Sequence, residues 1–272
     1  MKPTIAITLY RRPEQTKILF EALEGAYGFE DFKIFIHVDV SMEHVDACHD
    51  VCALANNFGM KHSNVRQVYH SDPRLGVDKA KLFILPKAFQ NHDRVIFLED
   101  DTVLSKDALL YFEWALKQTE NDHDCLSISG YNRREDPCPV GDEFTVSMRP
   151  GFCPWGWATH KRVWDKFYDE GRYERYSGEN VNGLFDHYLD TEGKERAMYS
   201  VYPILGRTNH GTWQDAEHTP SEEHWLEHEN SEYGIWLPVY DLTVPLAMNS
   251  RYGYKVDVKL DEQLNLNSSA DF

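Results

Sequence analysis

The sequence has 272 residues, of which 42% are hydrophobic and 27% are charged, so it can bury the core of one large globular domain. Its net charge is −17, and so acidic a surface argues against nucleic acid or an anionic membrane as a general partner. No stretch approaches the roughly 20 apolar residues of a membrane span, and the N-terminus lacks the apolar core of a signal peptide. We therefore expect a cytoplasmic protein without a membrane anchor. The five cysteines are odd in number and widely spread, which is not the pattern of a disulfide framework.

The first hundred residues alternate between short apolar runs, which predict strands, and segments with helical spacing. Strands are expected at 4–9, 33–39, 65–69 and 95–98, and helices at 13–23, 43–57 and 79–89. This alternation predicts an α/β fold with a mostly parallel sheet flanked by helices. No Gly-x-Gly-x-x-Gly follows the first strand and no Walker loop occurs, which disfavours a dinucleotide dehydrogenase and a P-loop kinase.

The second half of the chain is less regular. A helix is expected at 107–118 and a strand at 125–131, followed by a polar, proline-containing loop or short hairpin at 132–150. Residues 151–159 lead into a helix that contains Val163, Trp164 and Phe167. The periodicity weakens after about residue 170, and the polar segment 261–272 is expected to be a frayed tail.

Three carboxylates, Glu99, Asp100 and Asp101, directly follow the apolar run of residues 95–98. Such a run predicts a strand that is buried on both faces, and open α/β sheets bind ligands at the carboxyl ends of their strands. Adjacent like charges repel, so we expect a cation there, most simply a hard divalent metal with oxygen ligands. The alternative is a solvated acidic turn. The strand ends near Arg12 and Asp39 should lie at the same edge.

Four segments, taken in order, resemble a known family. They are Leu-Tyr-Arg-Arg-Pro-Glu at 9–14, Phe-Leu-Glu-Asp-Asp at 97–101, Phe-Cys-Pro-Trp-Gly-Trp-Ala-Thr at 152–159 and Phe-Asp-His-Tyr at 185–188. Pro203, Arg207-Thr208 and Asn209-His210-Gly211 then follow at similar spacing. The ordered set resembles GT-A-fold glycosyltransferases, and more narrowly N-acetylglucosaminyltransferase I and the soluble bacterial sugar transferases related to it.

The resemblance implies a GT-A (Rossmann-like) mixed, mostly parallel sheet flanked by helices, with a smaller acceptor-side C-terminal part. Residues 1–130 would form the nucleotide-sugar-binding half, and 131–260 the half of the same domain that binds the acceptor and carries the catalytic base. The implied activity is inverting transfer of a sugar, GlcNAc or similar, from a UDP-sugar to a hydroxyl of a glycan or other acceptor. The implied cofactor is Mn²⁺ or Mg²⁺.

The family pattern also implies roles for the residues at the strand ends. Asp101 of this Glu-Asp-Asp motif would hold the metal, while Asp100 and Glu99 would contact sugar or ribose hydroxyls. Arg12 and Asp39 would bind the base and ribose. For Arg12, a surface position with an ion pair to the nearby glutamate of the same segment is the alternative.

Asp186 matches the position of the family's catalytic base, which takes the proton of the acceptor hydroxyl. A helix-capping role after Gly183 is the alternative. The family has a second acidic residue where this sequence has His187. That departure leaves open whether His187 assists the base or only packs.

Aromatic and histidine residues complete the implied donor site. Trp155, Gly156 and Trp157 would form a wall and lid beside the donor sugar, because aromatic faces pack on pyranose C–H groups. Two core tryptophans are the alternative. His210 or His218 would reach the diphosphate or the metal, and His218 fits the family spacing better.

Two lysines, Lys79 and Lys81, lie where the family has basic residues near the donor, but we interpret them as solvated side chains. Two other functions stay open from the residues alone. A nucleotidyltransferase also uses carboxylates and a metal, although no Gly-rich phosphate loop is present. A non-catalytic carbohydrate-binding protein would suit the many aromatic residues, but it would need neither the acidic run nor Asp186.

Overall fold

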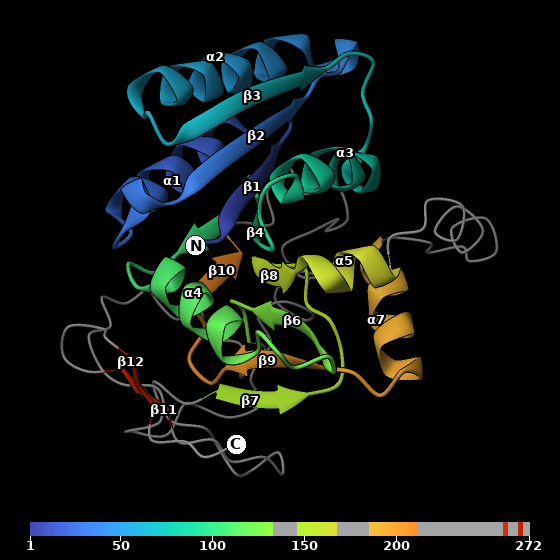
Figure 1. The fold of residues 1–272 in the computed structure, drawn as a ribbon. Coiled ribbons are helices and arrows are strands. Elements are labelled where there is room, and N and C mark those ends of the chain that lie inside the picture. The colour runs from blue at the N-terminus through green and yellow to red at the C-terminus, as the bar shows by residue number, and fades with distance from the viewer. Residues whose placement is uncertain (133–145, 168–184, 211–257, 261–265, 269–272) are drawn as a thin grey trace, which may run out of the picture.

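The computed structural model describes residues 1–132, 146–167, 185–210, 258–260 and 266–268, and every structural statement below concerns these residues (Figure 1). Eight strands form one sheet in the order β3-β2-β1-β4-β8-β6-β9-β7. Two further strand pairs, β10-β5 and β11-β12, lie outside it. The strands are β1 (Thr4–Leu9), β2 (Lys33–Asp39), β3 (Val65–Ser71), β4 (Arg94–Glu99), β5 (Thr102–Leu104), β6 (Cys125–Ser129), β7 (Val146–Arg149), β8 (Trp157–His160), β9 (Tyr199–Pro203), β10 (Thr208–His210), β11 (Val258–Leu260) and β12 (Leu266–Ser268).

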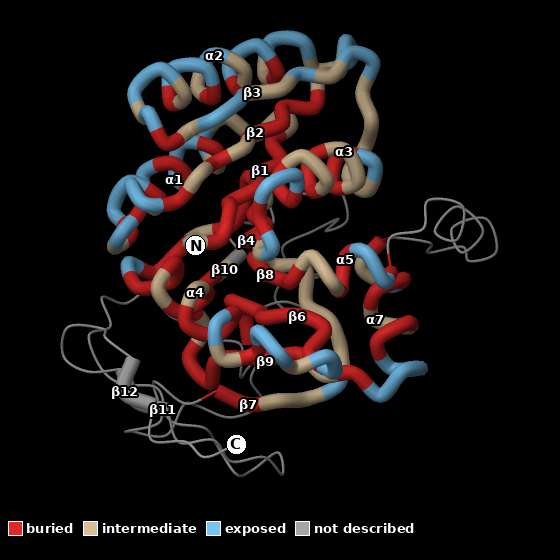
Figure 2. Tube along the Cα trace, viewed as in Figure 1, coloured by how far each residue is buried: buried red, intermediate tan, exposed pale blue. Residues whose placement is uncertain are grey.

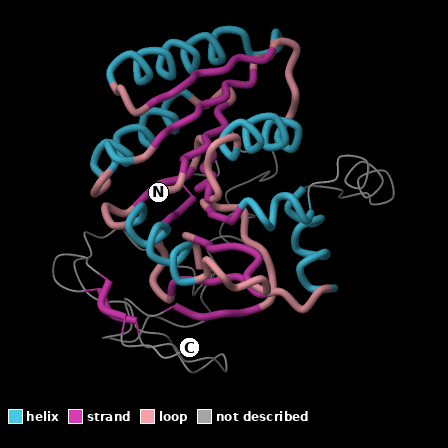
Figure 3. The backbone as a smooth tube through the Cα atoms, viewed as in Figure 1, coloured by secondary structure: helices cyan, strands magenta, loops and turns pink. Residues whose placement is uncertain are grey.

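Helices cover both faces of the sheet, as Figure 3 shows for the magenta strands between cyan helices. They are α1 (Pro13–Gly25), α2 (Val45–Lys61), α3 (Val77–Phe89), α4 (Ala108–Gln118), α5 (Lys161–Phe167) and α7 (Phe185–Glu195), with short 3₁₀ turns at Phe29–Asp31 and Met42–His44. Buried side chains of α1, α2 and α4 belong to one hydrophobic cluster, and those of α3, α5 and α7 belong to another. Among the helices in the described part of the chain, none is both long and apolar enough to cross a bilayer.

The central strands contribute alternately to the two clusters. Ile96 and Leu98 of β4 belong to the first cluster, whereas Val95 and Phe97 belong to the second. Figure 2 shows β1 buried along its length, and β4 is buried except at its two end residues. This is the environment that the continuous apolar run predicted. Because β1, β2, β3 and β4 are parallel neighbours, the segments that follow them begin at the same edge of the sheet.

Elements of the first half are confirmed to within a few residues of their predicted bounds, but several later strands were missed. Residues 157–160 form β8, which runs antiparallel between β4 and β6, where we had expected only an approach to a helix. The strand β9 was not predicted either. Within the segment that we expected to fray, Leu266–Ser268 pairs with β11 as β12. These strands are three to five residues long, too short to show a period of two.

A buried ion pair ties the start of α4 to the segment before β10. Arg207 is 1% exposed, and its Nε donates to Oδ2 of Asp107 over 2.8 Å. Ser105 donates its hydroxyl to the other carboxylate oxygen of Asp107 and its backbone N–H to the carbonyl of Arg207. Arg207, which matches the family pattern, therefore has a structural role in this chain.

We expect Asp107→Ala to lower the free energy of unfolding by about 3–5 kcal/mol, because it leaves a buried guanidinium without its carboxylate. Urea denaturation followed by circular dichroism would measure the change. The matched control is Asp165→Ala, which removes the exposed Lys161–Asp165 pair and should cost no more than about 1 kcal/mol. Equal losses in the two variants would contradict the structural role of the buried pair.

Candidate functional site

Arg12 lies directly on the acidic run at the end of β4. Its Nη2 is 2.5 Å from Oδ1 of Asp100 and 2.9 Å from Oδ2 of Asp101. Burial opposes the charge of Arg12, but the adjacent carboxylates outweigh burial and raise its pKa above the usual value. Arg12 is thus not a surface arginine. The expected meeting of strand ends brings a cation to these carboxylates from the segment after β1.

Burial dominates the acid–base properties of the acidic run. The pKa of Asp100 is raised by burial, although Arg12 opposes that shift. The pKa of Glu99 is raised to about 7 by burial and by the neighbouring carboxylates, against the opposing charge of Lys81. The run is therefore a buried cluster that depends on cations and not a solvated acidic turn.

A cavity of about 80 Å³ opens at this edge of the sheet. Its lining includes Thr8, Tyr10, Arg12, Arg74 and Glu99. Two buried polar atoms of its lining residues, the hydroxyl of Tyr10 and Nη1 of Arg12, have no hydrogen-bond partner among the described residues. Unsatisfied buried donors are rare in native proteins, so these two atoms favour a polar ligand in the cavity.

Asp39 also lines the cavity, yet both of its oxygens already accept hydrogen bonds from the protein. Oδ1 accepts from the Ser71 hydroxyl at 2.7 Å and from the Leu75 N–H at 2.8 Å, and Oδ2 accepts from the Gly76 N–H at 2.8 Å. The expected role of Asp39 in binding base and ribose therefore competes with a role in holding the segment before α3. That segment carries Arg74.

Arg74 lies over the face of Tyr10, with its Cζ 4.3 Å from the ring centroid. A guanidinium attracts an aromatic ring when it lies within about 6 Å of the ring centroid, so this contact is a cation–π interaction. Sequence reasoning missed Arg74, since an arginine after Asp72-Pro73 looks like an ordinary turn residue. The available signal was its position just before a helix that starts at the edge where open α/β sheets usually bind ligands.

Lys81 was interpreted as a solvated lysine, and this was wrong. It is 1% exposed and donates to Oδ1 of Asp186 over 3.0 Å, while Oε1 of Glu99 lies 3.6 Å from the same Nζ. Lys81 shares the buried stripe of α3 with Ile84, Leu85 and Ala88, and this i, i+3, i+4, i+7 spacing was visible in the sequence. The ammonium brings the acidic run and Asp186 together.

Asp186 lies in the first turn of α7, close to the helix N-terminus, and is partly exposed, but it is not among the residues that line the cavity. His187 is exposed. In the described part of the chain, His187 therefore does not pack in the core. The backbone of His210 pairs with Thr102, the residue after Asp101, which brings the end of β10 to the acidic run. His218 lies outside the described residues.

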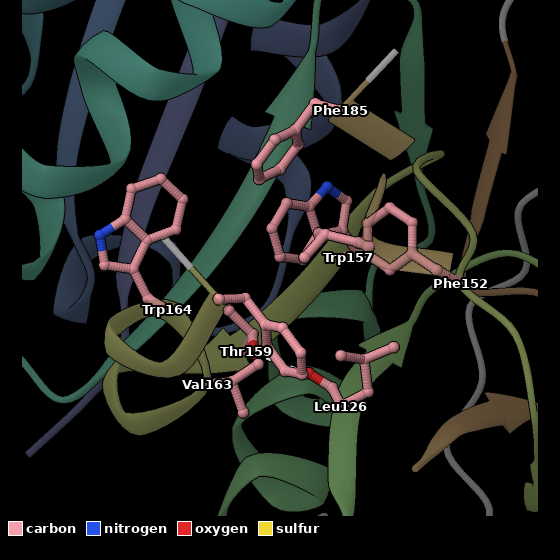
Figure 4. A pocket seen from close by; sticks show the side chains of 9 residues that line it. Leu126, Phe152, Trp157, Thr159, Val163, Trp164 and Phe185 are labelled. Carbon is pink, nitrogen blue, oxygen red and sulfur yellow. Dashed lines mark hydrogen bonds between the residues drawn. The ribbon is translucent and has the colours of Figure 1, made fainter. Parts of the chain in front are cut away.

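The tryptophan pair divides between two environments. Trp157 is 2% exposed and packs between Phe97 and Phe152, with ring centroids 5.6 and 5.0 Å away. Figure 4 shows it among the side chains that line an apolar cavity. The volume of this cavity is about 10 Å³, too small for anything larger than a water. Trp157 thus has the core position that the sequence left as the alternative. Trp155 is less buried, and its ring contacts Tyr131 at 4.7 Å.

Gly156 links the two tryptophans and has little room for a side chain. Its φ is +72°, and an added Cβ would lie 2.7 Å from Cγ2 of Thr208. The Thr208 hydroxyl donates to the carbonyl of Trp155 over 2.7 Å. Glycine is therefore needed here for close packing between the Trp-Gly-Trp segment and β10.

The carboxylates fit a divalent cation only in a limited way. Asp100 and Asp101 offer the hard oxygen ligands that Mg²⁺ and Mn²⁺ prefer. However, no group of three or more His, Cys, Asp and Glu side chains that could hold a metal occurs among the described residues. The donor set therefore suits a cation that takes one or two protein oxygens and its remaining ligands from phosphate and water.

The chain has the GT-A fold, the α/β architecture of a large class of glycosyltransferases. Among solved structures it is similar to GalNAc-T7 crystallised with UDP, GalNAc and Mn²⁺, with a TM-score of 0.54, 11% identity, and coverage of 77% of this chain and 44% of that one. It is also similar to TarS from S. aureus, with a TM-score of 0.43, 14% identity, and coverage of 61% and 49%.

These likenesses have clear limits. The chain spans about half the length of each solved relative or less. At 11% identity, the likeness to GalNAc-T7 supports the fold alone, and the TM-score to TarS is too low to carry an argument. No protein-family model matches the sequence, and no curated protein is significantly similar to it. The narrower resemblance to N-acetylglucosaminyltransferase I stays a prediction.

A buried histidine lies beneath the Asp39 segment. His37 is fully buried, and its Nε2 lies 3.0 Å from the Ser71 hydroxyl oxygen, whose proton is donated to Asp39. Burial lowers the pKa of His37 from 6.5 to about 4. Between pH 4 and pH 6.5, the imidazole of His37 is therefore neutral in the folded protein. In the unfolded chain the same imidazole binds a proton in that range.

We expect the free energy of unfolding to fall as the pH is lowered from 6.5 to 4, because the unfolded state binds more protons in that window. His37→Gln should flatten this dependence by on the order of 2 kcal/mol. Burial also lowers the pKa of His160 and His92, so part of the slope should persist. Urea denaturation across this pH range would measure it, with the exposed His49→Gln as control. Parallel profiles for wild type and His37→Gln would rule out this contribution.

Proposed function

We propose that the protein is a glycosyltransferase that moves a sugar from a nucleotide-sugar to an acceptor hydroxyl. The observation that carries this proposal is the cavity at the edge of a GT-A sheet, with the unsatisfied donors of Tyr10 and Arg12 beside a buried acidic run. A pyrophosphate and a sugar supply the acceptor atoms that those donors lack.

The donor nucleotide would lie against Tyr10, near the Arg74 guanidinium that covers the same ring. The segment before α3, which is hydrogen-bonded to Asp39, would lie at the edge of the nucleotide. A uracil base suits such a planar, cationic position. UDP also occurs in the GalNAc-T7 structure that shares this fold. We therefore propose a UDP-sugar as donor, with UDP-GlcNAc or a similar N-acetylhexosamine donor as the first compound to test.

Negative charge grows on the diphosphate as the bond to the sugar breaks, and the site would stabilise that charge with cations. Arg12 lies at the acidic run and lines the cavity. Its Nη1 has no hydrogen-bond partner among the described residues and could donate to a phosphate. Asp101, with help from Asp100, would hold Mn²⁺ or Mg²⁺ there. A bound divalent cation would supply Lewis-acid charge to the two phosphates.

Transfer with inversion needs a base on the face of the sugar opposite the diphosphate. The acceptor oxygen forms its bond to the anomeric carbon, the bond to the diphosphate breaks, and the acceptor proton passes to the base. Asp186 is our candidate for this base, because its carboxylate is partly exposed and held near Glu99 by Lys81. Glu99 would contact hydroxyls of the donor sugar.

We expect Asp101→Ala to bind UDP with manganese at least tenfold more weakly than the wild type, since it removes the proposed metal ligand. Calorimetric titration of UDP with and without manganese would measure the effect. The exposed Asp50→Ala should behave as the wild type. Unchanged manganese-dependent UDP binding in Asp101→Ala would remove the metal assignment.

We expect Asp186→Asn to fold and bind UDP normally but to transfer sugar about 10²–10⁴-fold more slowly, the usual contribution of a general base. Product formation from a panel of UDP-sugars, with thermal shift as the binding control, would measure this. Normal turnover in the variant would assign the base role elsewhere. A wild-type protein that binds a UDP-sugar without ever transferring it would instead favour the carbohydrate-binding alternative.

A further inference from the structure

Lys81 is a fully enclosed cation that makes no direct contact with the reacting groups of the proposed chemistry. It lies in α3, whereas its two carboxylate partners lie at the end of β4 and in the first turn of α7. The contacts are 3.0 Å to Asp186 and 3.6 Å to Glu99. Enclosed lysines are rare because the charged form loses its hydration, and they persist only where partners compensate.

The surroundings of Lys81 keep its charge. Burial alone would lower the pKa of Lys81, but Asp186, Glu99 and Asp78 outweigh burial and raise it above the usual value. Asp78 acts from the same helix, and Asp100 and Asp101 lie beyond Glu99 on the next segment. One ammonium therefore serves carboxylates from three parts of the chain.

The arrangement solves a geometric problem of the proposed reaction. Glu99 and Asp186 repel each other, yet a carboxylate that contacts the donor sugar and a base that acts at its anomeric carbon must lie close together. A cation between them lets the two carboxylates approach and fixes their separation. The exposed Lys79, two residues earlier on the same helix, has no such position.

We propose that Lys81 is a positioning residue for sugar transfer, which holds the Asp186 carboxylate at a fixed place opposite Glu99. This inference rests on the proposed function and deepens it. Lys81 itself does not touch the reacting atoms in this proposal. It acts through Asp186, and the donor nucleotide binds at the Tyr10–Arg74 end of the cavity without it.

The first test is Lys81→Met, which keeps the length of the side chain and removes the charge. We expect kcat to fall about 10²-fold, the usual cost of a base displaced by about 1 Å, with the Kd for UDP changed less than threefold. Lys79→Met is the matched control and should keep wild-type kcat. A merely structural lysine would instead lower Tm and UDP affinity together while sparing kcat of the folded fraction.

The second test asks whether Lys81 acts through Asp186. If it does, adding Lys81→Met to Asp186→Asn should lower kcat less than threefold further, because a misplaced base that is already absent costs nothing more. Should Lys81→Met fail to fold, Lys81→Arg carries the test. It keeps the charge but not the point-like ammonium, so kcat should fall at least tenfold with UDP binding unchanged.

Wild-type kcat in Lys81→Met or, where that variant does not fold, in Lys81→Arg would overturn the proposal, as would losses that multiply in the double variant. These outcomes differ from failure of the proposed function. If the wild-type protein transfers no sugar from any nucleotide-sugar, the glycosyltransferase proposal falls and the role of Lys81 falls with it. If the wild type transfers sugar but the Lys81 variants do so equally well, only the positioning role is lost.

Discussion

Three consecutive carboxylates at the end of a buried strand are the constraint on which the site depends. Taking even one carboxylate out of water is costly, and three neighbours also repel each other. Two cations from different elements of the chain compensate these negative charges. Arg12, just before α1, binds Asp100 and Asp101, whereas Lys81 from the inner stripe of α3 faces Glu99. The sheet edge, the two helices and the acidic run are therefore one electrostatic unit.

The two cations differ in how much of their hydrogen-bonding capacity the protein itself uses. Arg12 retains an unsatisfied N–H-bearing atom beside the cavity, so it has capacity left for an anion. Lys81 is enclosed, and both of its described partners are carboxylates of the protein. The run is thus linked to the segment before α1 at one end and to α7 at the other, and of these two cations Arg12 is the one that keeps a donor for an anion.

Local pattern was enough to predict the first half of the fold but not the second. The strands β1, β2 and β4 are long apolar runs whose burial on both faces follows from composition, and parallel crossovers place their ends together. By contrast, β8 consists of four residues, and its position between β4 and β6 depends on partners that are distant in sequence. Such pairing is set by tertiary contacts, so no local period could reveal it.

The same distinction applies to the site. The acidic run and Arg12 could be placed from sequence because each directly follows a recognisable central strand. Arg74 was harder to place, since its position also depends on three hydrogen bonds that Asp39 accepts from the segment around it. Lys81 is the instructive case. A lysine at the edge of a helix surface can extend its ammonium into water, but one in the apolar stripe that packs on the sheet cannot. Its ammonium must therefore pair with an anionic group inside the protein. With three carboxylates expected at the neighbouring strand end, the helical spacing alone already favoured a buried, paired ammonium over a solvated one.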